Sequence, residues 1–176
     1  MSKNKDYETP ETFLKLAKEY FRALLKFEEV YKNKVPDISK IETKEDYEKI
    51  KSHRGYPLLF TLMNVKLFLV RHSLELGLKS FLLHKGVTIN KLRDRKLYHH
   101  NLENCLNGVW KYGLQIFNNL NNEKDHTAIV LIKKINMSWE DKIYEYPNKY
   151  EKIYTKEYLY IIKTVLKAVS TEFKNK

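Results

Sequence analysis

The short stretch RDRKLYHHN, residues 93–101, brings together residue types suited to proton transfer and phosphate binding. It holds two arginines, Arg93 and Arg95, and two adjacent histidines, His99 and His100, in a chain with six histidines. An arginine can hold a phosphate through two hydrogen bonds and neutralise the charge that develops on it. A histidine can take a proton from a ribose 2′-hydroxyl near neutral pH. Together they would suffice for metal-free cleavage of RNA, in which the 2′-oxygen attacks the adjacent phosphorus.

A second group of polar residues lies upstream, in the segment RHSLELGLKS. Arg71, Glu75 and Lys79 follow one another at intervals of four, and His72 stands beside them, so on a helix the four share one face. We expect Arg71 and Lys79 to contact phosphate, together with two lysines of the connecting segment, Lys91 and Lys96. The residues expected to support the site are His72, Glu75, Asp94 and Asn101.

Each of these groups also has a purely structural interpretation. His100 can be a hydrogen-bonding residue at the start of a helix, and His99 a surface residue. The polar residues of segment 71–79 can form an ion-pair ladder. The tyrosine-rich segment 144–160 would either stack RNA bases or pack as a C-terminal cover. The sequence leaves these alternatives open.

Motifs of several other chemistries are absent from the sequence. It contains no GxxxxGK[ST], GxGxxG or HExxH pattern. His99 and His100 are adjacent, so on a helix they diverge by about 100° and cannot easily share a metal. Only two acidic residues occur in residues 51–100, which argues against a magnesium site there. We therefore expect no metal and no cofactor.

The net charge is concentrated in the middle of the chain. Of the total of +11, residues 51–100 contribute +8, from 10 Lys+Arg and 2 Asp+Glu. Residues 1–50 sum to zero, and residues 101–176 contribute +3. A basic excess this local favours a face that binds a polyanion, and the alternative is a well-solvated lysine-rich surface.

The composition predicts a single all-α domain over residues 1–176, since glycine (5) and proline (4) are scarce and the length allows a real core. The one cysteine, Cys105, favours a reducing compartment and a buried position. The N-terminus MSKNKDYETP lacks the features of a signal peptide, and the apolar run PLLFTLMNVKLFLV is too short to cross a bilayer. We expect a cytoplasmic protein without membrane contact.

Capping residues and apolar spacing predict five to six helices. The expected helices cover 10–31 (Thr9 as cap), 43–53, 57 to Gly86, 101 to about 120, 126–135 (Asp125 as cap) and a last helix capped by Thr155. The helix from residue 57 should be the central, buried helix, because its first half is apolar nearly all round. We expect the last helix to point Tyr158, Ile162, Val165 and Val169 inward. The basic connection 85–100 and the segment 139–154 are expected to be irregular.

The segments RHSLELGLKSFLLHKG and HHNLENCLN together resemble the core of the HEPN family, whose members commonly show an "E..LK.ll" helix followed by "H.L..L" at the start of the next. The resemblance covers residues 57–120 well and the termini loosely. It implies an up-and-down helical bundle. Many HEPN proteins are endoribonucleases whose motif is an arginine, a polar residue and a histidine four to six residues after the arginine. Arg93 with Asp94 fits this motif, and so does Arg95 with His100, although Lys96 takes its polar position.

The resemblance therefore implies an RNA-directed protein, a metal-independent endoribonuclease of toxin or phage-defence type. Arg93 or Arg95 would hold the scissile phosphate, and His100, with His99 as substitute, would be the general base. The alternative is a non-catalytic HEPN-like module that binds RNA, a nucleotide or a protein partner such as an antitoxin. HEPN proteins usually work as dimers, so we expect a homodimer with residues 57–110 at or near its interface.

Overall fold

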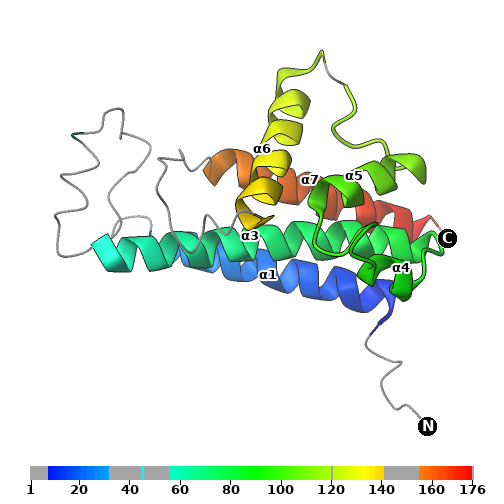
Figure 1. The fold of residues 1–176 in the computed structure, drawn as a ribbon, viewed down its shortest axis with the longest axis horizontal. Coiled ribbons are helices and arrows are strands. Elements are labelled where there is room, and N and C mark those ends of the chain that lie inside the picture. Colours follow the sequence, from blue (N-terminus) through cyan, green and yellow to red (C-terminus); the bar gives the residue numbers. More distant parts are fainter. Residues whose placement is uncertain (1–7, 32–44, 46–55, 120, 141–154, 176) are drawn as a thin grey trace, which may run out of the picture.

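The computed structural model describes residues 8–31, 45, 56–119, 121–140 and 155–175 (Figure 1). Every regular element in this part of the chain is a helix, so the predicted all-α class is confirmed. The elements are α1 (Pro10–Tyr31), α3 (Tyr56–His84), α4 (Ile89–Arg93), α5 (Leu102–Lys111), α6 (Glu123–Glu140) and α7 (Thr155–Lys174). Among these described helices, none is long and apolar enough to span a membrane.

Helix α3 is the central element, and α1, α5 and α7 all pack against it. Figure 1 shows α1 and α7 as long helices beside α3, with α5 and α6 on the side away from α1. Two buried serines fix the direction of α1. Ser73 Oγ donates a hydrogen bond to the Ala17 carbonyl (2.9 Å), and Ser80 Oγ donates one to the Pro10 carbonyl (2.8 Å). Because position 80 meets position 10 and position 73 meets position 17, α1 runs antiparallel to α3.

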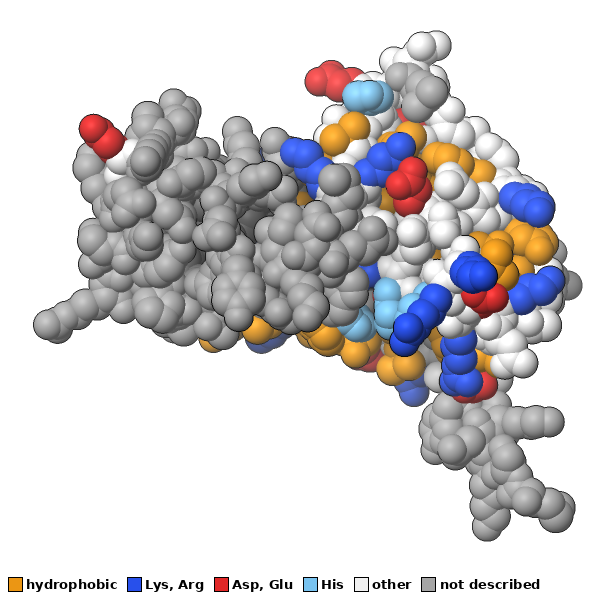
Figure 2. Space-filling view, viewed as in Figure 1, with side chains coloured by type: hydrophobic (Ala, Val, Ile, Leu, Met, Phe, Trp, Pro, Cys, Tyr) orange, Lys and Arg blue, Asp and Glu red, His pale blue; other side chains and the backbone are white. Residues whose placement is uncertain are grey.

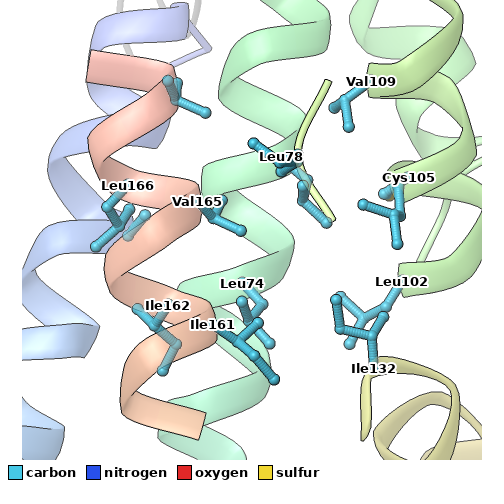
Figure 3. Close-up of a cluster of buried hydrophobic side chains, with 14 of the residues drawn as sticks. Leu74, Leu78, Leu102, Cys105, Val109, Ile132, Ile161, Ile162, Val165 and Leu166 are labelled. Carbon is cyan, nitrogen blue, oxygen red and sulfur yellow. The ribbon is translucent and has the colours of Figure 1, made fainter. Parts of the chain in front are cut away.

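The core lies where the second half of α3 meets α5, α6 and α7 (Figure 3). Gly77 lets α7 approach closely, since a Cβ there would stand 3.2 Å from Val165 Cγ1. The expected inward residues of the last helix are all buried, and so is Cys105. The residues labelled in Figure 3 show which helices contribute to this core: Leu74, Leu78, Leu102, Cys105, Val109, Ile132, Ile161, Ile162, Val165 and Leu166.

The central position of helix α3 is as predicted, and its described side chains differ in burial along its length. Val65 and Phe68 are 40 % and 41 % exposed, whereas from Val70 to Leu82 nearly every side chain is buried. The physical reason is the placement of the neighbours, because α5 and α7 cover the second half of α3 (Figure 1). Arg71, Glu75 and Lys79 belong to the buried part of the helix, so these three charges lie inside the fold.

The helix predicted over residues 101–120 is shorter than expected, because it ends at Lys111. The chain then turns at Gly113, whose φ of 95° suits glycine, and at Phe117, whose φ is 54°. Phe117 is still buried, but it reaches the core from a loop and not from a helix face.

Two smaller predictions also need correction. The connection 85–100 contains the short helix α4, whose first turn is capped by Thr88. Asp125 lies inside the first turn of α6, and the Asn122 side chain accepts from the backbone N–H groups of Lys124 and Asp125. Helix α7 begins at Thr155, and the residues before it lie outside the described part of the chain, so the cap by Thr155 stays a prediction. Helix α1 has the predicted bounds. The helix expected over 43–53 and most of the segment 139–154 lie outside the described residues.

Candidate functional site

The segment that carries the two histidines is a compact series of turns between α4 and α5. Asp94 organises it. Its backbone carbonyl accepts hydrogen bonds from the N–H groups of Leu97 (3.1 Å), Tyr98 (3.2 Å) and His99 (3.2 Å). Its side chain accepts from the N–H of Lys96 at 2.8 Å. Asp94 was expected to support the site, and its observed contacts are hydrogen bonds to the backbone of the segment that carries the histidines.

Asn101 starts helix α5 directly after the histidine pair. Its side-chain oxygen accepts from the N–H of Asn104 at 2.8 Å, which is the bond of an N-terminal cap. The cap is therefore Asn101, and His100 is the residue before it. This position leaves the His100 imidazole to interact with α3.

His100 is held by a buried carboxylate of α3. Its Nδ1 lies 3.0 Å from Glu75 Oε1 and 3.2 Å from Oε2, while Lys79 Nζ donates to Oε1 at 2.6 Å. The side chain of His100 is 48 % exposed and that of Glu75 is 6 % exposed. A carboxylate only accepts hydrogen bonds, so Nδ1 of His100 carries the proton and Nε2 is the basic nitrogen.

Burial and charge act in opposite directions on Glu75. Burial raises the pKa of its carboxyl group, but the charges of Lys79 and His100 and their hydrogen bonds lower it, and the net pKa is below the usual value. Glu75 is therefore ionised near neutral pH. It is a fixed negative charge that orients the His100 ring from inside the fold.

Arg71 holds the backbone of the same residue. Its Nη2 donates to the His100 carbonyl, and its Nη1 donates to the Ile135 carbonyl of α6 at 3.5 Å. Arg71 is 1 % exposed. The sequence placed Arg71 and Lys79 as phosphate contacts, but both side chains are buried in the structure and bonded within it. Arg71 holds the backbone of His100, and Lys79 holds the Glu75 carboxylate that contacts the His100 ring.

The other two histidines of the predicted site, His99 and His72, lie beside His100 and its partners. The ring of His99 stands 4.1 Å from that of His100. Lost hydration and then the neighbouring charges of His100, Lys79 and Arg95 hold the pKa of His99 below its usual value. His72 packs against Tyr20 and Phe68, and burial lowers its pKa as well.

Four cations of the predicted site are exposed, and one of them is paired. Arg93 Nη2 donates to the Glu8 carboxylate, which lies just before α1. The charge of Arg95 is one of those that lower the pKa of His99. Figure 2 shows histidine side chains next to lysine and arginine side chains on one face of the molecule. The exposed cations are Lys91, Arg93, Arg95 and Lys96.

Sequence reasoning missed one residue of this site, Asn136 of α6. Asn136 is buried, and its Oδ1 accepts from the N–H of Leu102 at 2.8 Å. A single asparagine in an amphipathic helix gives no signal of such a contact, because the two residues are 34 positions apart.

Within the described residues, no group of three or more His, Cys, Asp and Glu side chains could hold a metal ion. The arrangement is suited to proton transfer by a histidine whose ring is oriented by a buried glutamate, beside exposed cations that can bind a phosphate. Fold and site together define an all-helical protein with a carboxylate-held histidine in a basic turn. Comparison with protein-family models, curated proteins and solved structures finds no significant match.

Proposed function

We propose that the chain is a HEPN-like, RNA-directed protein that cleaves RNA without a metal ion, as a toxin or defence-type endoribonuclease. The observation that carries this proposal is the hydrogen bond from His100 Nδ1 to the buried Glu75 carboxylate. A histidine fixed in this way has one ring nitrogen assigned as a donor and the other as the base. The basic turn next to it supplies the charge that an RNA backbone requires.

In the proposed reaction, His100 Nε2 takes the proton of a ribose 2′-hydroxyl. The 2′-oxygen then attacks the adjacent phosphorus, and the bond from phosphorus to the 5′-oxygen breaks. The 5′-oxygen takes a proton from water, so the products are a 2′,3′-cyclic phosphate and a 5′-hydroxyl. Arg95 would hold the scissile phosphate, and Lys91 and Lys96 would bind the flanking backbone. Arg71, Glu75 and Lys79 act from inside the fold as positioning residues.

The test is incubation with structured and unstructured RNA in EDTA. We expect the wild type to cleave RNA and to leave DNA of the same sequence intact, because DNA lacks the 2′-hydroxyl. The His99→Ala/His100→Ala double variant should lose this activity. His126→Ala, which removes an exposed histidine of α6, should retain it. A wild type that cleaves none of a varied set of RNAs would reject the nuclease proposal.

The bond between Arg93 and Glu8 favours a second candidate, a non-catalytic HEPN-like module. In that bond, one of the two candidate phosphate-binding arginines is engaged by a carboxylate just before α1. The module would bind RNA, a nucleotide or a protein partner such as an antitoxin through the same basic face. RNA binding by the wild type, with no cleavage and with loss of binding in an Arg95→Ala/Lys96→Ala variant, would identify this module.

We further propose that the protein works in the cytoplasm as a homodimer. The buried single cysteine suits a reducing compartment. A two-fold contact near residues 57–110 would bring two histidine sites together, and the exposed Val65 and Phe68 of α3 offer apolar surface within that range. Since two basic faces repel, added salt should tighten the dimer. Light scattering that gives a monomer at both low and high salt would reject it.

A further inference from the structure

Two hydrogen bonds link helix α6 to the backbone around the histidines, one directly and one through the Arg71 side chain of α3. Asn136 Oδ1 accepts from the N–H of Leu102, and the Ile135 carbonyl accepts from Arg71, which also donates to the His100 carbonyl. The two contacts flank Asn101, the cap of α5. The residues on either side of that cap are thus fixed to α6, one directly and one through a buried arginine.

The apolar side of α6 fixes where these polar contacts fall. Ala128, Leu131, Ile132 and Ile135 are buried, and α6 packs on α5 and α7. Ile132 lies in the same core cluster as Leu102 and Cys105 (Figure 3). Rotation or withdrawal of α6 would therefore move Asn136 away from the start of α5 while it opened the core.

We infer that α6 is a positioning element for the histidine, with Asn136 as its key residue, and that it keeps the His100 imidazole on Glu75 by fixing residues 100–102 against α3. The catalytic meaning of this inference rests on the function proposed above. Asn136 is not a catalytic residue, since it bonds to the backbone of Leu102 and acts through His100.

An alternative is that Asn136 serves only the stability of α5. Its acceptor satisfies one of the N–H groups that the first turn of a helix leaves without an intrahelical partner. A purely stabilising role predicts that variants of Asn136 unfold more easily while His100 stays on Glu75 in the folded fraction. A positioning role predicts that the His100 contact itself is lost in folded protein.

The experiment measures this contact by NMR on the full chain labelled with ¹⁵N and ¹³C at histidine and glutamate. The wild type should show His100 with its proton on Nδ1. The Asn136→Leu variant, which removes the acceptor at similar volume, should lose this signature. The pKa of Glu75 should move upward in the same variant, because the hydrogen bond and charge of His100 help to lower it.

Three further variants complete the design. Asn136→Asp keeps the acceptor oxygen and should retain both signals. In Asn136→Ser the side chain is too short to reach Leu102. This variant replaces Asn136→Leu if circular dichroism shows that Asn136→Leu does not fold. Ser73→Ala is the matched control, since it removes a buried hydrogen bond from α3 to the Ala17 carbonyl of α1 and should leave His100 and Glu75 unchanged.

In cleavage assays the Asn136→Leu variant should lose activity by a factor on the order of 10 to 100, with rescue by Asn136→Asp. Unchanged His100 and Glu75 signals in folded Asn136→Leu or Asn136→Ser would overturn the inference. The NMR signals require no RNA. A wild type that cleaves no RNA but shows the expected signals would thus reject the nuclease and still support positioning by α6.

Discussion

The second half of α3 and the turn after α4 carry the same kinds of side chain in opposite surroundings. Arg71, Glu75 and Lys79 of α3 are 1 %, 5 % and 7 % exposed, and each is bonded inside the fold. The basic turn residues Arg95 and Lys96 are exposed to solvent. Helix α3 ends at His84, only five residues after Lys79, yet the two regions have different physical roles.

The difference lies in what each charge loses on folding. A buried charge gives up its hydration and depends on its partners, so the removal of one partner leaves the other uncompensated. An exposed charge keeps its water and contributes little to stability even when it is paired, as Arg93 is with Glu8. We therefore assign shaping of the site to the buried group and ligand binding to the exposed group.

The largest effect should come from the buried pair. Replacement of Glu75 by leucine leaves Lys79 buried without its carboxylate and releases His100, and we expect a loss of about 3–5 kcal/mol in the free energy of unfolding. Chemical denaturation measures this loss.

Two further variants test whether the loss comes from the unpaired lysine. The Glu75→Leu/Lys79→Met double variant should recover much of the loss, since no isolated charge remains inside. Glu19→Ala, which breaks an exposed pair with Arg22, should change stability by about 1 kcal/mol or less. If Glu75→Leu costs no more than Glu19→Ala, the distinction between the two regions fails.

The second prediction uses pH to distinguish the buried carboxylate. The folded-state pKa of Glu75 lies below its ordinary value of 4.5, so its contribution to stability is complete above that value and is lost as pH falls through the folded pKa. The wild type should therefore lose stability more steeply below pH 4.5 than Glu75→Gln, which cannot ionise. Thermal unfolding at a series of pH values measures both slopes. Equal slopes for wild type and Glu75→Gln would contradict the prediction.

Local sequence signals were sufficient for much of the fold. Thr9 and Pro10 at the start, with apolar residues at helical spacing, predict α1 with the bounds observed. The predicted end of α5 was wrong because apolar residues continue to recur past Gly113, where the backbone has already left the helix. Periodicity reports which residues are buried, and Phe117 shows that a loop residue can satisfy it equally well.

The site was predictable in its residue types but not in its contacts. The spacing of four between Arg71, Glu75 and Lys79 places them on one face, but it does not reveal whether that face meets water or another helix. Whether these three side chains are buried depends on α5 and α6, which come later in the chain. The partners of His100 and Leu102 are 25 and 34 positions away, and no local rule specifies contacts at that range.

The last prediction concerns the exposed cations, where the effect on stability should be smallest. Replacement of Lys91, Arg93, Arg95 and Lys96 together by alanine removes solvated side chains, so each change should alter the free energy of unfolding by about 0.5 kcal/mol or less. RNA binding should respond strongly, because each phosphate contact contributes about 0.7 to the slope of log affinity against log salt concentration for a single strand. Fluorescence anisotropy with a labelled single-stranded RNA at several salt concentrations measures this slope.

The matched control removes four exposed lysines elsewhere, Lys15 of α1 and Lys156, Lys163 and Lys167 of α7. Both variants lower the net charge by four, so a general effect of charge would flatten the two slopes equally. A local interface at the basic turn would flatten only the first. Equal slopes for the two variants would move the RNA-binding surface away from the histidines, and the exposed turn would then differ from the buried half of α3 in hydration alone.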